Sequence, residues 1–77
     1  MLTLQINEAE IAQLKYEMYR YPDALLQKRL HSIYLKSMNQ SLSCKEIGLY
    51  SGLSRQKVSD FIKMYNQSGI QSLKLWY

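Results

Sequence analysis

The spacing of helix boundary signals in the middle of the chain limits the possible folds more than any other sequence feature. Ser43 and Glu46 have the spacing of a capping box, which is a strong signal for the start of a helix. Gly52 is the residue type that ends helices, and Ser54, two residues later, is a preferred N-cap for the next helix. These signals predict a helix–turn–helix unit, whose helices cross steeply and lie at about residues 44–51 and 55–67.

The apolar residues of this unit recur one helical turn apart, so they predict which faces pack together. Gly48 gives the first helix a small residue where the second helix must approach closely, and Leu53 is expected to enter the core from the turn. The residues expected to face inward are Ile47, Leu53, Val58, Phe61, Ile62 and Tyr65. The opposite face of the second helix is polar.

An extended arm and two further helices are predicted before this unit. Residues 2–6 alternate between apolar and polar types, and Asn7 with Glu10 repeats the capping-box signal. Pro22 closes the first of these helices, because the residue before a proline is pushed out of helical geometry. The two helices are expected at about residues 7–20 and 23–38. The expected inward residues are Ile11, Leu14, Met18 and Tyr21, then Leu26, Leu30, Ile33, Tyr34 and Met38, with Lys28, Arg29 and Lys36 elsewhere on the second helix.

Length and composition favour a single all-α domain over residues 1–77. The chain has 77 residues, 47% of them hydrophobic, with only three Gly and one Pro, so helices joined by short loops are expected. The single Cys44 excludes an internal disulfide and weakly favours a reducing, cytoplasmic setting. We expect no membrane span, because the apolar runs are short, and no signal peptide at the N-terminus.

Basic residues are concentrated in the half of the chain that holds the helix–turn–helix. The net charge is +4, with five Lys/Arg and four Asp/Glu in residues 1–43 but five Lys/Arg and two Asp/Glu in residues 44–77. This excess lies where the phosphates of a nucleic acid would need neutralising. The alternative is a positive surface that only keeps the protein in solution.

The polar face of the helix at 55–67 is the predicted contact with double-stranded DNA. A helix in this position fits the major groove, where Gln pairs with adenine and Arg with guanine. Asp60 can accept a hydrogen bond from cytosine or orient a basic neighbour. The residues expected to read bases are Arg55, Gln56, Ser59, Asp60 and Lys63, and those expected to reach phosphates are Lys28, Arg29, Lys45 and Lys57. The alternative is an ordinary solvated helix face.

No set of residues predicts catalysis, a metal site or a bound cofactor, so we expect a protein that is not an enzyme. The six acidic residues form no group with metal-ligand character, and glycine-rich phosphate loops are missing. His31, the only histidine, is expected to be a surface or partly packed residue. Tyrosines can form a stacking platform for single strands. Because the tyrosines here are spread over four helices, core and rim packing is favoured for most of Tyr16, Tyr19, Tyr34, Tyr50 and Tyr65.

The order of motifs along nearly the whole chain carries a family resemblance. The segments LTLQINEAEI, LLQKRLHSIYLKSM and SCKEIGLYSGLSRQKVSDFIKMYNQSGIQSL resemble the homeodomain-like, N-terminal helix–turn–helix domain of bacterial insertion-sequence transposases related to the mariner superfamily. Two positions depart from the family pattern. Gly48 replaces the usual alanine and should loosen its helix by roughly 0.5–1 kcal/mol, and Lys57 stands where threonine is frequent.

The resemblance implies recognition of the inverted repeats at the ends of a mobile element by a bacterial, nucleoid-associated protein. In that family a separate downstream domain cuts DNA, so the chain is expected to be an excised fragment, a relic or a free-standing binder. A second interpretation is a small regulator or antitoxin-like protein that binds DNA as a homodimer through its apolar tail, residues 71–77. A third is a protein-interaction module that has lost DNA binding.

Overall fold

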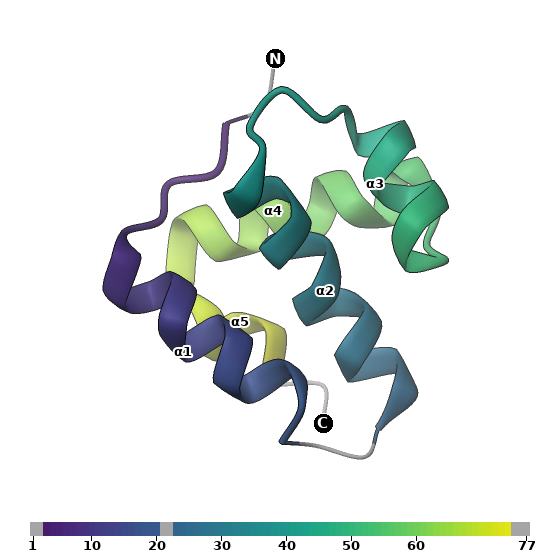
Figure 1. Cartoon of the computed structure of the whole chain (residues 1–77). Coiled ribbons are helices and arrows are strands. Elements are labelled where there is room, and N and C mark those ends of the chain that lie inside the picture. The colour runs from purple at the N-terminus through teal and green to yellow at the C-terminus, as the bar shows by residue number, and fades with distance from the viewer. Residues whose placement is uncertain (1–2, 21–22, 75–77) are drawn as a thin grey trace.

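The chain folds into a bundle of α-helices, seen in a computed structural model that describes residues 3–20 and 23–74 (Figure 1). The helices are α1 (Glu8–Met18), α2 (Ala24–Met38), α3 (Cys44–Ser51), α4 (Arg55–Ser68) and α5 (Ile70–Lys74). The predicted all-α fold is confirmed, and no strand occurs in these two ranges. No helix of the described residues is both long enough and apolar enough to cross a membrane.

Local capping signals set most of the helix starts. The side chains of Asn7 and Ser43 each accept a hydrogen bond from the backbone of the glutamate three residues on, and each glutamate reaches back, so both predicted capping boxes are present. Asp23 caps α2 through a 3.0 Å bond from the Leu26 amide, and is therefore not its first residue. At the other end α1 stops at Met18, two residues earlier than expected. Pro22, the predicted terminator, lies outside the described residues.

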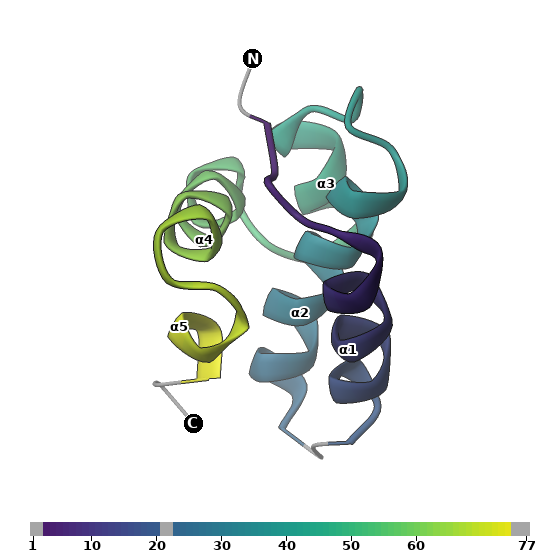
Figure 2. The same cartoon turned by 90° about the vertical axis from the view of Figure 1, so that its left-hand side faces the viewer.

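Helix α2 is the centre of the bundle and contacts α1, α3, α4 and α5. Figure 2 shows α1 on one side of α2, with α4 and α5 on the other. The short α5 was predicted only as an apolar tail, but it turns back after Gly69 and packs on α2 and α4. Ile70 and Leu73 are buried in the core, with 8% and 0% of their surface exposed, so these two residues are not free to contact a partner. The rest of the tail, residues 75–77, lies outside the described residues.

The core combines apolar residues from every helix and from the arm. Its fully buried members come from α1 to α5 and are Leu14, Leu30, Ile33, Ile47, Val58, Ile62 and Leu73. Together with the nearly buried Met18, Leu26, Phe61 and Tyr65, these include most of the residues that helical periodicity predicts to face inward. Four inward predictions were less accurate: Ile11, Tyr34 and Leu53 are only half-buried, and Met38 is 60% exposed. Tyr21, also predicted to face inward, lies outside the described residues. Met38 is the last residue of α2, and at this helix end its place on the helical stripe does not bring it to the core.

Lys36 was predicted to lie away from the core, and this was wrong. Only 1% of its surface is exposed. Its ammonium group donates to the backbone oxygens of Gln40 at 2.6 Å and of Leu42 at 2.8 Å. Both acceptors belong to the connector between α2 and α3, which folds back over the end of α2. The lysine thus satisfies carbonyl groups of the connector and fixes the point at which α3 starts.

The predicted extended arm is present, and two side-chain amides hold it. Gln40 accepts from the Leu4 amide at 3.1 Å and donates to the Leu4 carbonyl at 3.0 Å. On the other edge of the arm, Asn66 of α4 accepts from the Gln5 amide and donates to the Thr3 carbonyl, both at 2.8 Å. The amides occupy the hydrogen-bonding positions that neighbouring strands would fill in a sheet. This pairing ties the N-terminus to the connector and to the second half of α4.

We predict that Lys36→Met lowers the free energy of unfolding by about 1–3 kcal/mol, because the connector carbonyls lose their donor while the volume of the side chain is nearly kept. The measurement is urea unfolding followed by circular dichroism. Lys15→Met, at an exposed position of α1, is the matched control and should change stability by less than about 0.5 kcal/mol. Equal stability of the two variants would show that the bonds of Lys36 contribute little.

Candidate nucleic-acid interface

The turn between α3 and α4 is closed on a single carbonyl group. The backbone amides of Gly52 and Leu53 both donate to the oxygen of Gly48, at 2.9 and 3.0 Å. Gly52 has a φ of 78°, the left-handed conformation that ends helices and favours glycine. Ser54 then caps α4 by accepting from the Lys57 amide at 3.2 Å. The predicted helix–turn–helix geometry, with a turn of residues 52–54, is therefore present.

Gly48 is needed at its position because of the close approach of the turn. A Cβ atom added there would lie 2.5 Å from the backbone oxygen of Leu53, far inside van der Waals contact. The close approach predicted at Gly48 is present, but the atom that comes close is the Leu53 carbonyl oxygen of the turn, so an alanine there would do more than change the stability of α3. The lack of a side chain at Gly48 lets the turn pass directly over the helix, which sets the position of α4 against α3.

Helix α4 presents one polar face to solvent and buries the other. Val58, Phe61, Ile62 and Tyr65 are buried, as predicted. The side chains predicted to read DNA lie on the opposite face, and all are exposed except Ser59, which is half-buried: Arg55, Gln56, Lys57, Ser59, Asp60 and Lys63. Because α4 lies at one side of the bundle, away from α1, this face is free of covering helices (Figure 2).

Two cations from α2 lie beside the helix–turn–helix, although they are distant from it in sequence. The end of the Lys28 side chain runs along the turn, with its Cε and Nζ atoms 3.6 and 3.7 Å from where a Gly52 Cβ would be. The guanidinium carbon of Arg29 lies 5.4 Å from the centre of the Phe61 ring in α4, a cation–π distance. The Arg29 Nε atom is buried without a hydrogen-bond partner among the described residues. Both side chains were predicted to join the interface, and both lie next to it.

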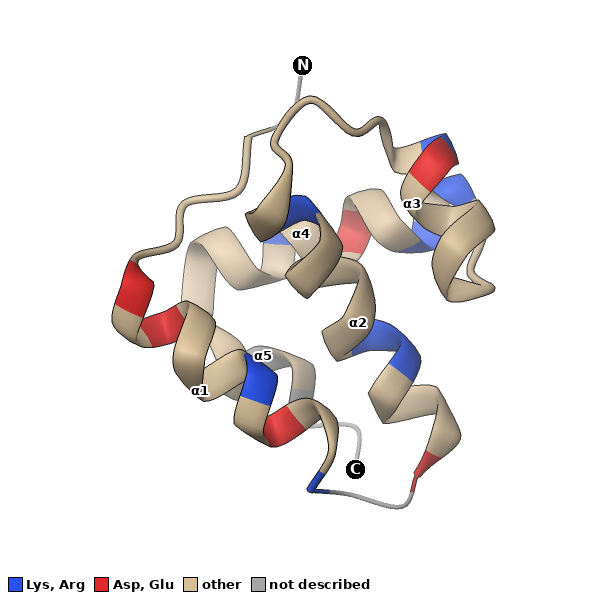
Figure 3. Cartoon of the chain, in the orientation of Figure 1, with Lys and Arg blue, Asp and Glu red and all other residues tan. Residues whose placement is uncertain are grey.

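Lys45 is set apart from these cations. It is exposed in the first turn of α3, whereas the turn at Gly52 follows the last residue of that helix (Figure 3). Seven residues of α-helix separate the two positions by roughly 10 Å. Lys45 therefore lies at the opposite end of α3 from the turn that the Lys28 side chain contacts.

An open hollow of about 370 Å³ lies between α2 and the first half of α4. The residues that line it are Arg29, Ser54, Gln56, Lys57, Asp60, Phe61 and Met64. Sequence reasoning treated Ser54 as a cap alone and did not mention Met64 as part of the site. The hollow combines two cations, a glutamine and a carboxylate with apolar side chains beneath them. Such a lining can bind a polar, anionic surface, but it contains no nucleophile paired with a base.

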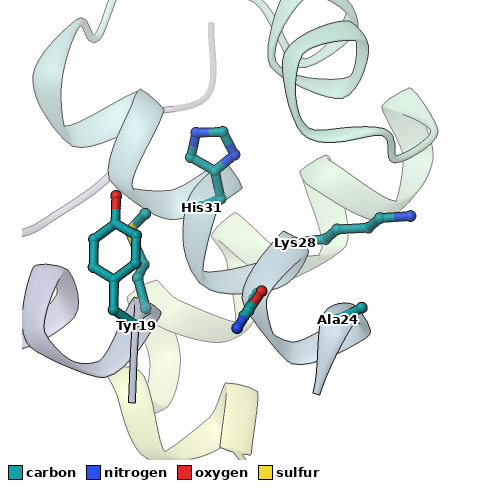
Figure 4. Close-up of a pocket in the computed structure, with 6 residues that line it drawn as sticks. Tyr19, Ala24, Lys28 and His31 are labelled. Atoms are coloured by element: carbon teal, nitrogen blue, oxygen red, sulfur yellow. The ribbon is translucent and has the colours of Figure 1, made fainter. Parts of the chain in front are cut away.

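A second hollow, of about 330 Å³, lies on the other side of α2 and includes the only histidine. Its lining residues are Met18, Tyr19, Ala24, Gln27, Lys28 and His31. In Figure 4, Tyr19 and Lys28 point away from each other on either side of His31. His31 is half-buried, as expected. In the described part of the chain no three His, Cys, Asp or Glu side chains come close enough to hold a metal ion.

The tyrosines do not form one surface. Tyr65 is in the core and Tyr34 is half-buried, which agrees with the expected packing role. Tyr16, Tyr19 and Tyr50 are instead 64%, 78% and 66% exposed, so the expectation of core or rim packing was wrong for these three. Tyr16 lies in α1, Tyr19 directly follows it, and Tyr50 lies in α3. Because α1 and α3 lie on different sides of α2 (Figure 1), these tyrosines make no continuous stacking platform.

Tyr65 links α4 to the start of α1. Its hydroxyl group donates to the Glu10 carboxylate at 2.8 Å. Burial, and then the hydrogen bond and negative charge of Glu10, raise the pKa of Tyr65 well above its ordinary value. The phenol is therefore held protonated, and its bond holds the buried face of α4 in place while the polar face points outward.

Comparisons with protein-family models, with curated proteins and with solved structures find no match to this chain. What this surface does must be argued from its own residues.

We predict that Gly48→Ala lowers the free energy of unfolding by about 1–2 kcal/mol, because the clash with the Leu53 oxygen outweighs the better helix propensity of alanine. Thermal unfolding followed by circular dichroism measures this. Leu49→Ala, at the exposed neighbouring position, is the control and should be nearly neutral. A Gly48→Ala variant more stable than the wild type would show that the close approach is not a constraint.

The Tyr65 bond predicts a pH dependence of stability. A group whose pKa is raised by folding stabilises the protein below its unfolded pKa, about 10 for tyrosine, and loses that contribution as pH rises further. Wild type should exceed Tyr65→Phe by about 1 kcal/mol at pH 7, and this advantage should fall above pH 10 by up to about 1.4 kcal/mol per unit. Urea unfolding of both proteins between pH 7 and 11 tests this. A constant difference across that range would contradict it.

Proposed function

We propose that this chain is a sequence-specific binding module for double-stranded DNA, which inserts α4 into the major groove. The observation that carries the proposal is the uncovered polar face of α4, held by a tight turn against α3 and flanked by cations of α2. A helix held in this way is the usual means by which a small domain reaches base edges.

The distribution of charge around α4 supports a partner rich in phosphate. Arg55 and Lys57 occupy its first turn, which contains no acidic residue, although cations there oppose the helix dipole. An approaching phosphate removes this conflict, because it is attracted by the side chains and by the free amides of the helix start. Arg29, whose guanidinium lies over the Phe61 ring of α4, adds a further positive charge along the hollow beside this helix start.

The family resemblance favours one form of this function, the recognition of mobile-element ends without the catalytic domain. Recognition of mobile-element ends concerns which DNA sequence is bound, and it uses the same protein–DNA contacts as the general proposal. It predicts that DNA selected by the protein from a random pool matches inverted repeats that flank its own gene. A selected sequence found instead in the promoter of that gene would favour the interpretation as a regulator.

Salt titration of binding to the selected duplex tests the proposed interface. Arg55→Ala and Lys63→Ala should each weaken binding and reduce the slope of log K against log salt by roughly one, because each removes one phosphate or base-edge cation. The slope is measured by fluorescence anisotropy with a labelled duplex.

Lys15→Ala is the matched control, since it removes the same charge from α1, on the far side of α2 from α4 (Figure 2). Its slope should equal that of the wild type. The proposal fails if the wild type binds no duplex at low salt, and the assigned face is wrong if the three variants behave alike.

A further inference from the structure

Helix α4 carries a single carboxylate, and it lies on the face assigned to DNA. Asp60 is exposed on the same side of the helix as Gln56 and Lys63. A negative charge at this position repels phosphates, so on a DNA-binding surface it weakens the long-range attraction. Its presence there calls for a specific contact that offsets the repulsion.

The contact that Asp60 makes is with Gln56, one helical turn earlier. The Gln56 Nε2 atom donates to the Asp60 Oδ1 atom at 3.0 Å. Lys57 and Lys63 stand three residues to either side, a spacing at which helical side chains meet. Within the described residues, however, no ion pair with Asp60 is formed. The Asp60 carboxylate therefore orients Gln56. The sequence-based alternative, in which Asp60 orients a basic neighbour, is not what the side chains show.

This bond fixes which way the Gln56 amide faces. An ionised carboxylate only accepts hydrogen bonds, so the amide nitrogen must point toward Asp60. One of its two N–H groups is then used, and the other remains free together with the Oε1 acceptor. This donor–acceptor pair matches the edge of adenine in the major groove, which offers N7 as acceptor and the N6 amino group as donor. Gln56 lies in the first turn of α4, where a recognition helix contacts base edges.

We propose that Asp60 is a positioning residue, which holds Gln56 in the orientation that reads an adenine in the target site. The inference rests on the proposed function, and it adds a base identity and a division of roles within the interface. Gln56 makes the contact with the base, and Asp60 acts through Gln56.

Two substitutions of Asp60 separate its hydrogen bond from its charge. Asp60→Ala and Asp60→Asn both remove the negative charge, so both should bind duplex DNA of any sequence more tightly than the wild type. Only Asp60→Asn keeps an oxygen that can accept from Gln56. Gln56→Ala removes the reader itself, and Gln67→Ala, exposed near the end of α4, serves as the control.

The experiment selects duplexes from a random pool with each variant and measures affinity for the wild-type site with every base at each position. Wild type, Asp60→Asn and Gln67→Ala should prefer adenine at one position by about tenfold or more. Gln56→Ala should lose that preference, and Asp60→Ala should lose most of it despite its tighter overall binding. Circular dichroism checks that the variants keep the wild-type helicity.

Three outcomes would overturn the proposal while the proposed function stands. The adenine preference of Asp60→Ala could be unchanged, or Asp60→Asn could lose this preference as fully as Asp60→Ala. Alternatively, Asp60→Ala could lose a preference for cytosine and keep the preference for adenine. The last would show that Asp60 itself reads a base. If the wild type binds no duplex, the proposed function falls as well, so the two failures are distinguishable.

Discussion

The close contact between α3 and the turn that follows it determines the geometry on which the rest of the molecule depends. The Gly48 oxygen receives the amides of Gly52 and Leu53, and the missing side chain of Gly48 leaves room for the Leu53 carbonyl. A chain that reverses within three residues over such a contact has little freedom in where the next helix starts. The direction of α4, and so the face that it presents, follows from an approach that only glycine permits.

Polar contacts distant in sequence hold this unit on its support. Lys36 ties the end of α2 to the connector before α3, and Tyr65 ties α4 to the start of α1. Gln40 and Asn66 clamp the arm from both edges. In a domain of this size the hydrophobic core is small, so a buried polar bond that is satisfied contributes a large share of the specificity of packing. The exposed face of α4 needs to supply none of that stability and is free to carry charge.

The parts of the fold that depend on neighbouring residues were predictable, and those that depend on the path of the chain were not. The caps at Asn7, Ser43 and Ser54 act within three residues, so the sequence alone locates the starts of α1, α3 and α4. Helical periodicity predicted Lys36 to lie away from the core. A helical wheel shows only the faces of one helix, so it cannot show that the following connector folds back over the end of α2. For the same reason α5 could be expected only as an apolar tail.

The candidate site was predictable as a face but not as a set of contacts. The period of α4 separates its outward residues from its core, and every one predicted there is exposed except Ser59, which is half-buried. The position of Arg29 over Phe61 joins two helices, which no local pattern indicates. Likewise the sequence offered two roles for Asp60, and only the side-chain geometry shows that it bonds to Gln56.

Local conflicts in the sequence are concentrated on this same face. Cations at the start of α4 oppose the helix dipole, and a carboxylate interrupts a basic surface. Exposed positions such as these change stability little, so folding alone does not account for the choice of residue. Elsewhere the local signals agree with the fold: the capped helix starts, the glycine at the turn and the apolar stripes. Under the proposed function, the two conflicts on this uncovered surface would result from selection for a partner. In the DNA-binding function proposed above, the phosphates along the edge of the duplex and the base donors and acceptors in its groove would account for both conflicts together.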